Sequence, residues 1–274
     1  MKVEKVVRHH FPAVPGERFE LDAELGAVRI AAGDGEEIRV EVLLVAEAPG
    51  DAEAREMLER IHCEFLRTAS GPLVRSRVAA PRSFWRRGRR EADVTFSIAI
   101  PCRQDLVVET RVGDVAVAQV LGDVSVRTGA GAIGVDTVQG EVCVETASGP
   151  IEVCRVEERV TARTRVGDVR LLQIGGPVEV STVTGEIAAE IVRQPRSDSR
   201  LTTSTGSVSI SLPGSAGFLL DAATRIGQIV NRIPSFFSTA GLGGSLRTEV
   251  NGGGPRLTVR TSVGEVSIRP SVPA

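Results

Sequence analysis

Apolar and polar residues alternate over most of this chain, and a turn interrupts the alternation about every nine residues. The apolar members of successive segments are Val115 and Val117, Val124 and Val126, Val142 and Val144, and Ile151 and Val153. A period of two with one apolar face is typical of a β-strand that buries one side. Glycine at the corners supplies backbone angles that other residues avoid. The pattern therefore predicts short strands joined by tight turns.

A longer period of 18 residues orders these strands. A threonine, a glycine three residues later and an aliphatic residue two positions further recur together. The threonines are Thr110, Thr128, Thr146, Thr164 and Thr182, and the glycines are Gly113, Gly131, Gly149, Gly167 and Gly185. One such unit cannot bury its apolar face alone, whereas stacked coils can. Nine residues also leave no room for a crossover helix. We therefore expect an all-β fold, a parallel β-solenoid (β-helix-like) whose 18-residue coils each hold two strand–turn units of about nine residues.

Charged residues directly before the threonines predict how the coils are aligned. These are Glu109, Arg127, Glu145 and Arg163, which alternate in sign. Opposite charges on neighbouring strands favour their pairing. A slip by one coil would bring like charges together, so we interpret this column as control of register.

The segments that flank the regular repeat suit one continuous structure. Residues 1–109 are expected to form strands that lead into and cap the solenoid, and residues 110–274 to form the solenoid itself. In the first part, Met57, Leu58, Ile61 and Phe65 share one helical face, which predicts an amphipathic helix over 52–67. After Ile187 the repeat unit returns three times, separated by insertions at 194–200, 213–217 and 231–254. Such insertions are expected as loops on one side, often the binding side. The prolines of the last six residues are expected to block an open sheet edge.

Composition favours an aliphatic core and argues against nucleic-acid binding and membrane spans. Hydrophobic residues make up 42% of the chain and aromatic residues 3%, which fits a core of stacked aliphatic side chains. The net charge of −2 makes nucleic acid an unlikely partner. No apolar run approaches the ~18 residues of a membrane span. The first residues lack the apolar run of a signal peptide, and the four cysteines show no disulfide or metal spacing. We therefore expect a cytoplasmic location.

The repeated Thr-x-x-Gly-(Asp/Glu)-Val-x-Val unit resembles a known family. It follows a strand that ends at Pro101, and an Asn251-Gly252-Gly253-Gly254-Pro255 turn precedes the last unit. With the Phe84-Trp85 loop, these features are similar to the DUF4097 family, also called the putative adhesin or toast-rack family, over residues 15 to 270. The resemblance implies a β-solenoid-like fold and no established catalytic residues.

Two groups of side chains are candidates for binding or chemistry. The first is an arginine-rich loop that could hold phosphates or stack on bases, or be only a solvated hairpin; it comprises Arg82, Trp85, Arg86, Arg87, Arg89 and Arg90. The second is a set of acidic corner residues, which could bind Ca²⁺ or act on a sugar, or be turn residues in water; they are Asp123, Glu141, Asp168 and Glu186.

No cofactor and no catalytic residues are expected. Residues 129–134 match the dinucleotide motif GxGxxG, but Gly131 is the repeat glycine and a strand follows in place of the required helix. The histidines lack metal-ligand spacing. We therefore expect a non-enzymatic structural or interaction protein, which binds a protein partner or itself through the solenoid ends or loops. The alternatives are a polysaccharide-acting enzyme that uses the corner carboxylates, and anion or nucleic-acid binding by the Arg82–Arg90 loop.

Overall fold

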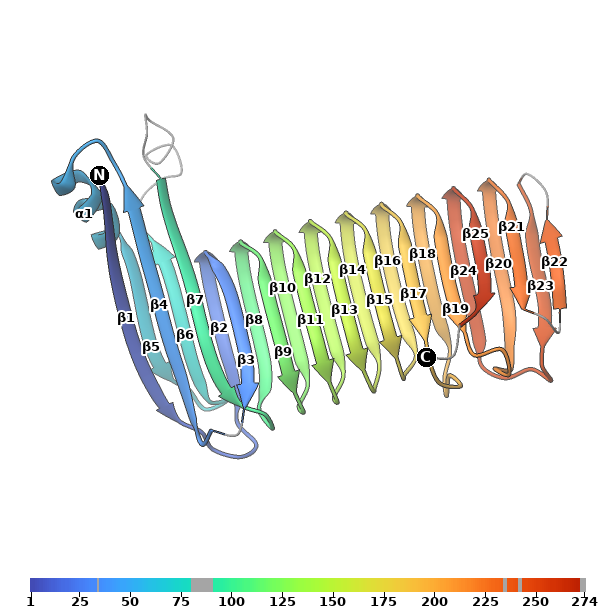
Figure 1. Cartoon of the computed structure of the whole chain (residues 1–274), viewed down its shortest axis with the longest axis horizontal. Coiled ribbons are helices and arrows are strands. Elements are labelled where there is room, and N and C mark those ends of the chain that lie inside the picture. Colours follow the sequence, from blue (N-terminus) through green and yellow to red (C-terminus); the bar gives the residue numbers. More distant parts are fainter. Residues whose placement is uncertain (34, 80–90, 234–235, 241–242, 272–274) are drawn as a thin grey trace. The chain divides into compact units, whose positions relative to one another are not determined.

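The computed structural model describes residues 1–33, 35–79, 91–233, 236–240 and 243–271 (Figure 1). The chain forms two compact units, Met1–Gly131 (unit 1) and Ala132–Ala274 (unit 2). Each unit contains two sheets, which we call A1 and B1 in unit 1 and A2 and B2 in unit 2.

Unit 2 is a stack of coils in which the chain alternates between sheets A2 and B2. In the regular coils, neighbouring strands run parallel, and residues that pair are 18 positions apart in the sequence. Val142 pairs with Val160, and Ile151 pairs with Val169. In spatial order, sheet B2 contains β12 (Val142–Ser148), β14 (Val160–Val166), β16 (Val178–Thr184), β18 (Ser199–Thr205), β24 (Arg256–Val263), β20 (Phe218–Ile226) and β23 (Ser245–Val250). Sheet A2 contains β11 (Ile133–Val138), β13 (Ile151–Val156), β15 (Val169–Ile174), β17 (Ile187–Ile191), β19 (Val208–Leu212), β25 (Val266–Pro270), β21 (Ile229–Ile233) and β22 (Phe236–Ala240). The predicted all-β solenoid is confirmed.

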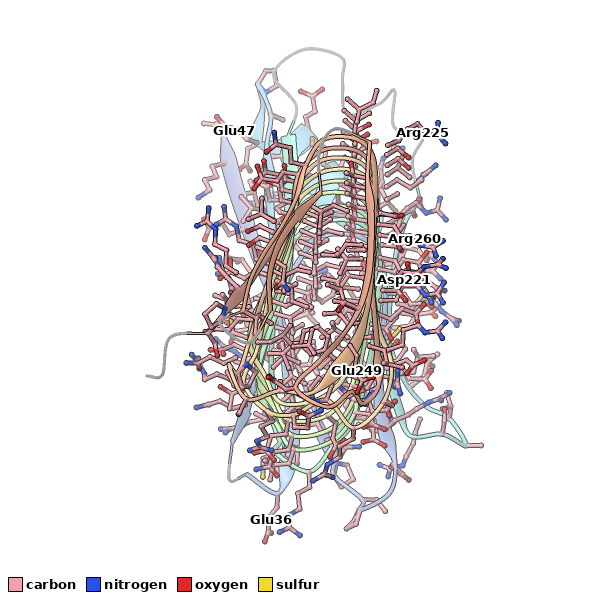
Figure 2. The ribbon with its side chains drawn as sticks, turned by 90° about the vertical axis from the view of Figure 1, so that its right-hand side faces the viewer. Glu36, Glu47, Asp221, Arg225, Glu249 and Arg260 are labelled. Carbon is pink, nitrogen blue, oxygen red and sulfur yellow. The ribbon has the colours of Figure 1, made fainter. Side chains whose placement is uncertain are left out.

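Aliphatic side chains fill the space between the two sheets of unit 2. The residues of one column, Val142, Val160 and Val178, are at most 1% exposed. Side chains drawn as sticks occupy the gap between the ribbons, and charged side chains point outward (Figure 2). Burial of a valine contributes roughly 1.5–3 kcal/mol, so the alternation seen in the sequence is the main stabilising pattern.

A ladder of hydrogen bonds at the corners explains the 18-residue motif. Five threonines of the repeat units in unit 2 are buried, and the Oγ1 of each donates to the carbonyl oxygen of the repeat glycine in the neighbouring coil. The distances are 3.4 Å for Thr164–Gly149, 3.3 Å for Thr182–Gly167, 3.1 Å for Thr203–Gly185, 2.9 Å for Thr261–Gly206 and 3.0 Å for Thr224–Gly264. The glycine is required because a Cβ on Gly185 would lie 2.0 Å from the oxygen of Gly167.

A second series with the same period is hidden in the sequence. Gln119, Thr137, Arg155 and Gln173 have φ values of 65°, 58°, 54° and 56°, in the left-handed region. Each is the next-to-last residue of its strand. Their side chains differ, so no residue type marks the position.

The coils of unit 2 do not stack in sequence order. The last coil in the sequence, β24 and β25, lies between β18 and β20 in sheet B2 and between β19 and β21 in sheet A2. The stack ends with β23 and β22, which run antiparallel to β20 and β21. The expectation that the C-terminal prolines block an open edge is wrong for Pro270, which pairs with Leu212 inside the sheet, and Pro273 lies outside the described residues.

The expectation that all three insertions form loops is wrong for 231–254, which contains strands β22 and β23. The other two insertions lie beside the glycine-rich turn. The Gln194 side chain donates to the carbonyl of Gly217 (2.8 Å) and accepts from its N–H (2.9 Å). The Asn251 side chain donates to the carbonyls of Gly214 (3.0 Å) and Ala216 (2.9 Å). These contacts join residues 194, 213–217 and 251 on one side of unit 2.

Unit 1 combines parallel coils with antiparallel strands. Sheet A1 contains β1 (Lys2–Pro12), β4 (Glu37–Glu47), β7 (Glu91–Pro101), β3 (Ala27–Gly33) and β9 (Val115–Val120). Sheet B1 contains β10 (Val124–Ala130), β8 (Asp105–Val112), β2 (Arg18–Leu25), β6 (Pro72–Val78) and β5 (Ile61–Arg67). Because β2 and β3 pair in parallel with β8 and β9, a coil-like unit already lies at residues 18–33.

The predicted helix over 52–67 is only half right. Helix α1 spans Asp51–Glu59 and buries Met57 and Leu58. Residues 61–67 form strand β5, which pairs antiparallel with β6. Alternation of Ile61, Cys63 and Phe65 fits a strand as well as the helical spacing fits a helix, and pairing with β6 decides between them.

The alternating charges occupy the predicted register within each unit. Arg127 pairs with Glu109 in unit 1, and their side chains approach to 3.8 Å. Glu145 pairs with Arg163 in unit 2. Arg163 also forms an ion pair of 2.7 Å with Glu179, and this hydrogen bond raises the pKa of the Arg163 guanidinium.

Candidate functional site

The arginine-rich loop lies outside the described residues. It comprises Arg82, Trp85, Arg86, Arg87, Arg89 and Arg90, all within the undescribed segment 80–90. Its role therefore stays a prediction.

The acidic corner residues are all exposed, and the described contacts around them include bonds across the turns. The Glu186 N–H donates to Oδ1 of Asp168 at 2.9 Å. In unit 1 the Asp123 N–H donates in the same way to Oδ1 of Asp105. Asp123 belongs to unit 1 and Glu141 to unit 2. The corner carboxylate of Asp168 thus stabilises the turn of the next coil.

The described part of the chain contains neither a metal-binding cluster nor a membrane-spanning helix. No group of three or more His, Cys, Asp or Glu side chains there is arranged to hold a metal ion. No helix within the described ranges is long and apolar enough to cross a membrane.

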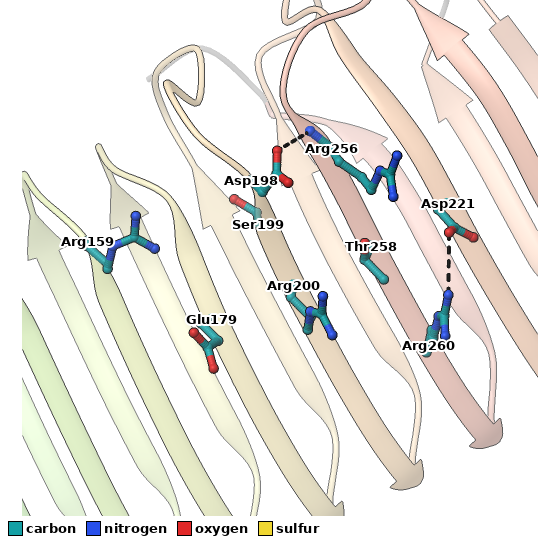
Figure 3. A pocket seen from close by; sticks show the side chains of 9 residues that line it. All are labelled: Arg159, Glu179, Asp198, Ser199, Arg200, Asp221, Arg256, Thr258 and Arg260. Carbon is teal, nitrogen blue, oxygen red and sulfur yellow. Dashed lines mark hydrogen bonds and ion pairs between the residues drawn. The ribbon is translucent and has the colours of Figure 1, made fainter.

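A polar groove of about 460 Å³ lies on the outer face of sheet B2 (Figure 3). We call it the arginine groove. Its side chains come from strands β16, β18, β24 and β20 and from the segments directly before β14 and β18. They are Arg159, Glu179, Asp198, Ser199, Arg200, Asp221, Arg256, Thr258 and Arg260.

Short side chains form the floor of the arginine groove. Ser199 is buried, and its Oγ accepts a hydrogen bond from the Val178 N–H at 3.2 Å. Thr258 is only 7% exposed. Figure 3 shows Arg200, Arg256 and Arg260 around Thr258. Long arginine side chains beside a short threonine leave the hollow.

The carboxylates of the arginine groove already have partners. Asp221 receives Arg247 at 3.3 Å and Arg260 at 3.4 Å. Oδ1 of Asp198 accepts the backbone N–H of Arg256 at 2.8 Å. Glu179 forms an ion pair with Arg163, which does not itself line the groove. Arginines therefore neutralise Glu179 and Asp221, whereas Asp198 is hydrogen-bonded but keeps its charge.

The arginines of the groove, unlike its carboxylates, have few partners within the protein. Among the described residues, the guanidinium groups of Arg200 and Arg256 have neither an ion pair nor a hydrogen bond. Arg159 donates only to the Ser197 hydroxyl, at 3.2 Å. The groove thus presents exposed guanidinium groups that no carboxylate of the described residues engages.

This site could not be predicted from the sequence, because the coils do not stack in the order in which they occur along the chain. Arg200 pairs across the sheet with Thr258, although the two are far apart in the chain. Arg159 lies 18 residues after Glu141, so in the sequence it only replaces the acidic residue expected at that corner. The spacing of 18 residues no longer holds at 200 or 256, so no periodic signal joins these arginines.

Comparison with known proteins identifies the family of the chain and a solved structure with a similar fold. The family model described as Toastrack DUF4097 matches residues 81–269. No curated protein matches the chain in sequence. The crystal structure of a putative adhesin from Bacteroides fragilis is similar over 97% of each chain, with 10% identity and a TM-score of 0.53.

A weaker structural likeness involves a putative cell adhesion protein from Clostridium sporogenes. It covers 97% of this chain and 100% of that one, with 10% identity and a TM-score of 0.30. At such identities, the likeness to the Bacteroides fragilis protein shows the fold alone.

Proposed function

Because the chain belongs to the Toastrack DUF4097 family, we propose that it is a non-enzymatic interaction protein. In this proposal a rigid β-solenoid binds a protein partner or a second copy of itself. The name adhesin, which similar structures carry, fits a binding role of this kind.

The filled interior of the coil stack is the observation that carries the proposal. Aliphatic residues of both sheets are buried throughout unit 2, and the threonine–glycine bonds fix the corners. Among the described strands of unit 2, these side chains fill the space between the sheets. In this proposal, recognition uses the outer faces, the loops or the ends.

The end strands supply a means of self-association. In the described part of the chain, β1 pairs only with β4, and β23 pairs only with β20. A strand that pairs on one side presents free backbone groups to another chain. Charged residues on β1, among them Lys2, Glu4 and Arg8, oppose pairing with an arbitrary strand. A partner would need complementary charges.

Light scattering across protein concentration, at low and at high salt, tests this proposal. For self-association we expect the mass to rise with concentration and to depend on salt, because charges on the edge strands are screened at high ionic strength. Hydrogen exchange should then show the amides of β1 or β23 becoming protected as the mass rises, while β14 stays unchanged.

A constant mass would remove self-association from the proposal and leave only a different protein as partner. Protection that rises equally in β14 would contradict pairing through the ends. The cytoplasmic location expected from the sequence stays a prediction, as do the polysaccharide-acting enzyme and the Arg82–Arg90 binding loop.

A further inference from the structure

We propose that the arginine groove on sheet B2 binds a compact ligand that carries two or more oxyanion groups, phosphate or carboxylate. The site is separate from the end strands, so this inference does not depend on self-association.

Charge within the groove points to an anion. Its lining contains four arginines and three carboxylates, but the carboxylates of Glu179 and Asp221 are engaged by Arg163, Arg247 and Arg260. The exposed guanidinium groups of Arg200 and Arg256 make no ion pair or hydrogen bond with a described residue, so both are open to a ligand. An unpaired guanidinium offers a planar fork of donors that matches a carboxylate or a phosphate.

Strand register indicates why the ligand should carry more than one anionic group. Arg200 lies opposite Thr258, and Arg256 and Arg260 lie two residues to either side of Thr258 on β24. With strands ~4.8 Å apart and a rise of ~3.3 Å per residue, Arg200 and Arg256 have Cα atoms about 8 Å apart. A ligand with two anionic groups a few ångströms apart can engage both forks without requiring the two like-charged guanidinium groups to converge on one oxyanion.

The size and polarity of the groove favour a small polar ligand. A volume of about 460 Å³ falls within the range of roughly 300–1,000 Å³ that is usual for small-molecule sites. The floor includes the short side chain of Thr258, and none of the nine lining residues is aromatic. A ligand that binds by stacking of rings is therefore disfavoured.

Isothermal titration of the full chain with pyrophosphate and with citrate tests the proposal, and inorganic phosphate is the single-group comparison. We expect at least one of the two larger anions to bind more tightly than phosphate. Binding by pyrophosphate alone identifies phosphate chemistry, and binding by citrate alone identifies carboxylate chemistry. Affinity should fall as salt is raised, since the contacts are ionic.

The double variant Arg200→Gln/Arg256→Gln is expected to weaken this binding by about tenfold or more, because each substitution removes charge-assisted hydrogen bonds. The control is Arg170→Gln, an exposed arginine on β15 of the other sheet, which should leave affinity within twofold. If the double variant has a lower urea midpoint, the two single variants carry the test, with a loss of about threefold or more each.

Two results would overturn the proposal. One is the absence of measurable binding by wild-type protein for both pyrophosphate and citrate at millimolar concentration. The other is an equal loss of affinity in Arg170→Gln, which would show only general attraction to a basic surface.

Discussion

The side chain of Thr203 ties two coils of unit 2 together. Its Oγ1 donates to the Gly185 carbonyl at 3.1 Å, and the residue is 2% exposed. We expect Thr203→Val to reduce the free energy of unfolding by about 1–2 kcal/mol, because the carbonyl loses a partner in a buried place. Urea unfolding measures the change. The matched control is Thr202→Val on the outer face of the same strand, expected to change stability by less than about 0.5 kcal/mol. Equal effects at both positions would show that the ladder contributes little.

Gln173 occupies a backbone conformation that suits glycine better. Its φ is 56°, and this region costs a residue with a Cβ roughly 1–2 kcal/mol. Glycine relieves that cost but loses about 0.5–1 kcal/mol in chain entropy. We therefore expect Gln173→Gly to raise the free energy of unfolding by up to about 1 kcal/mol in chemical denaturation.

The control for this substitution is Arg170→Gly, also exposed on β15 but not at positive φ. Here the entropy loss has no compensation, and stability should fall by about 0.5–1 kcal/mol. A loss of the same size at Gln173 would mean that the left-handed residue stores no strain.

At the scale of elements, strands β2 and β6 are joined by ion pairs on their outer face. Asp22 pairs with Arg77 and, at 3.4 Å, with Arg75. The hydrogen bond from Arg77 is the main cause that holds the pKa of Asp22 below its usual range. A lowered pKa in the folded state contributes stability that is present above the unfolded pKa of about 3.9 and is lost as pH falls through the folded value.

We expect Asp22→Asn to reduce the free energy of unfolding at pH 7 by no more than about 1 kcal/mol, because the side chain is one-third exposed and solvent screens the pair. The difference from wild type should shrink below about pH 4. Urea unfolding at pH 7, 5 and 3 measures it, with Glu59→Gln on α1 as the control. A difference that stays constant down to pH 3 would rule out ionisation of Asp22 as its source.

Sequence patterns predicted the elements of the regular coils because one period governs both burial and backbone bonding. The same reasoning extended the helix too far: Ile61 and Phe65 satisfy a helical face, but β6 offers them a strand partner. Local patterns carry no information on such a partner. The left-handed position at residues 119, 137, 155 and 173 was missed because glutamine, threonine and arginine all occupy it.

At the scale of unit 2, the order in which the coils stack could not be predicted from the sequence. The units at Thr203, Thr224 and Thr261 share one motif, so each would pair equally well with the next. Contacts of the insertions accompany the placement of β24 beside β18: Asp198 accepts the Arg256 N–H, and Asn251 donates to the carbonyls of residues 214 and 216. The arginine groove depends on that order, which is why no spacing of residues revealed it.

This arrangement predicts the effect of removing the last coil. A chain truncated after Gly254 lacks β24 and β25, so β18 and β20 both lose their parallel partner. Hydrogen exchange should then show faster exchange in residues 199–212 as well as in 218–233. A chain truncated after Ser271 keeps the coil and should behave as the full chain does.

If the coils stacked in sequence order instead, β20 would pair directly with β18, and removal of the last coil would leave residues 199–212 protected. Protection retained there would therefore contradict the arrangement. The observed order also requires residues 256–270 to enter between two coils that precede them in the chain. Until that segment is present, the edges of β18 and β20 stay open, so association during refolding should be strongest in the shorter chain.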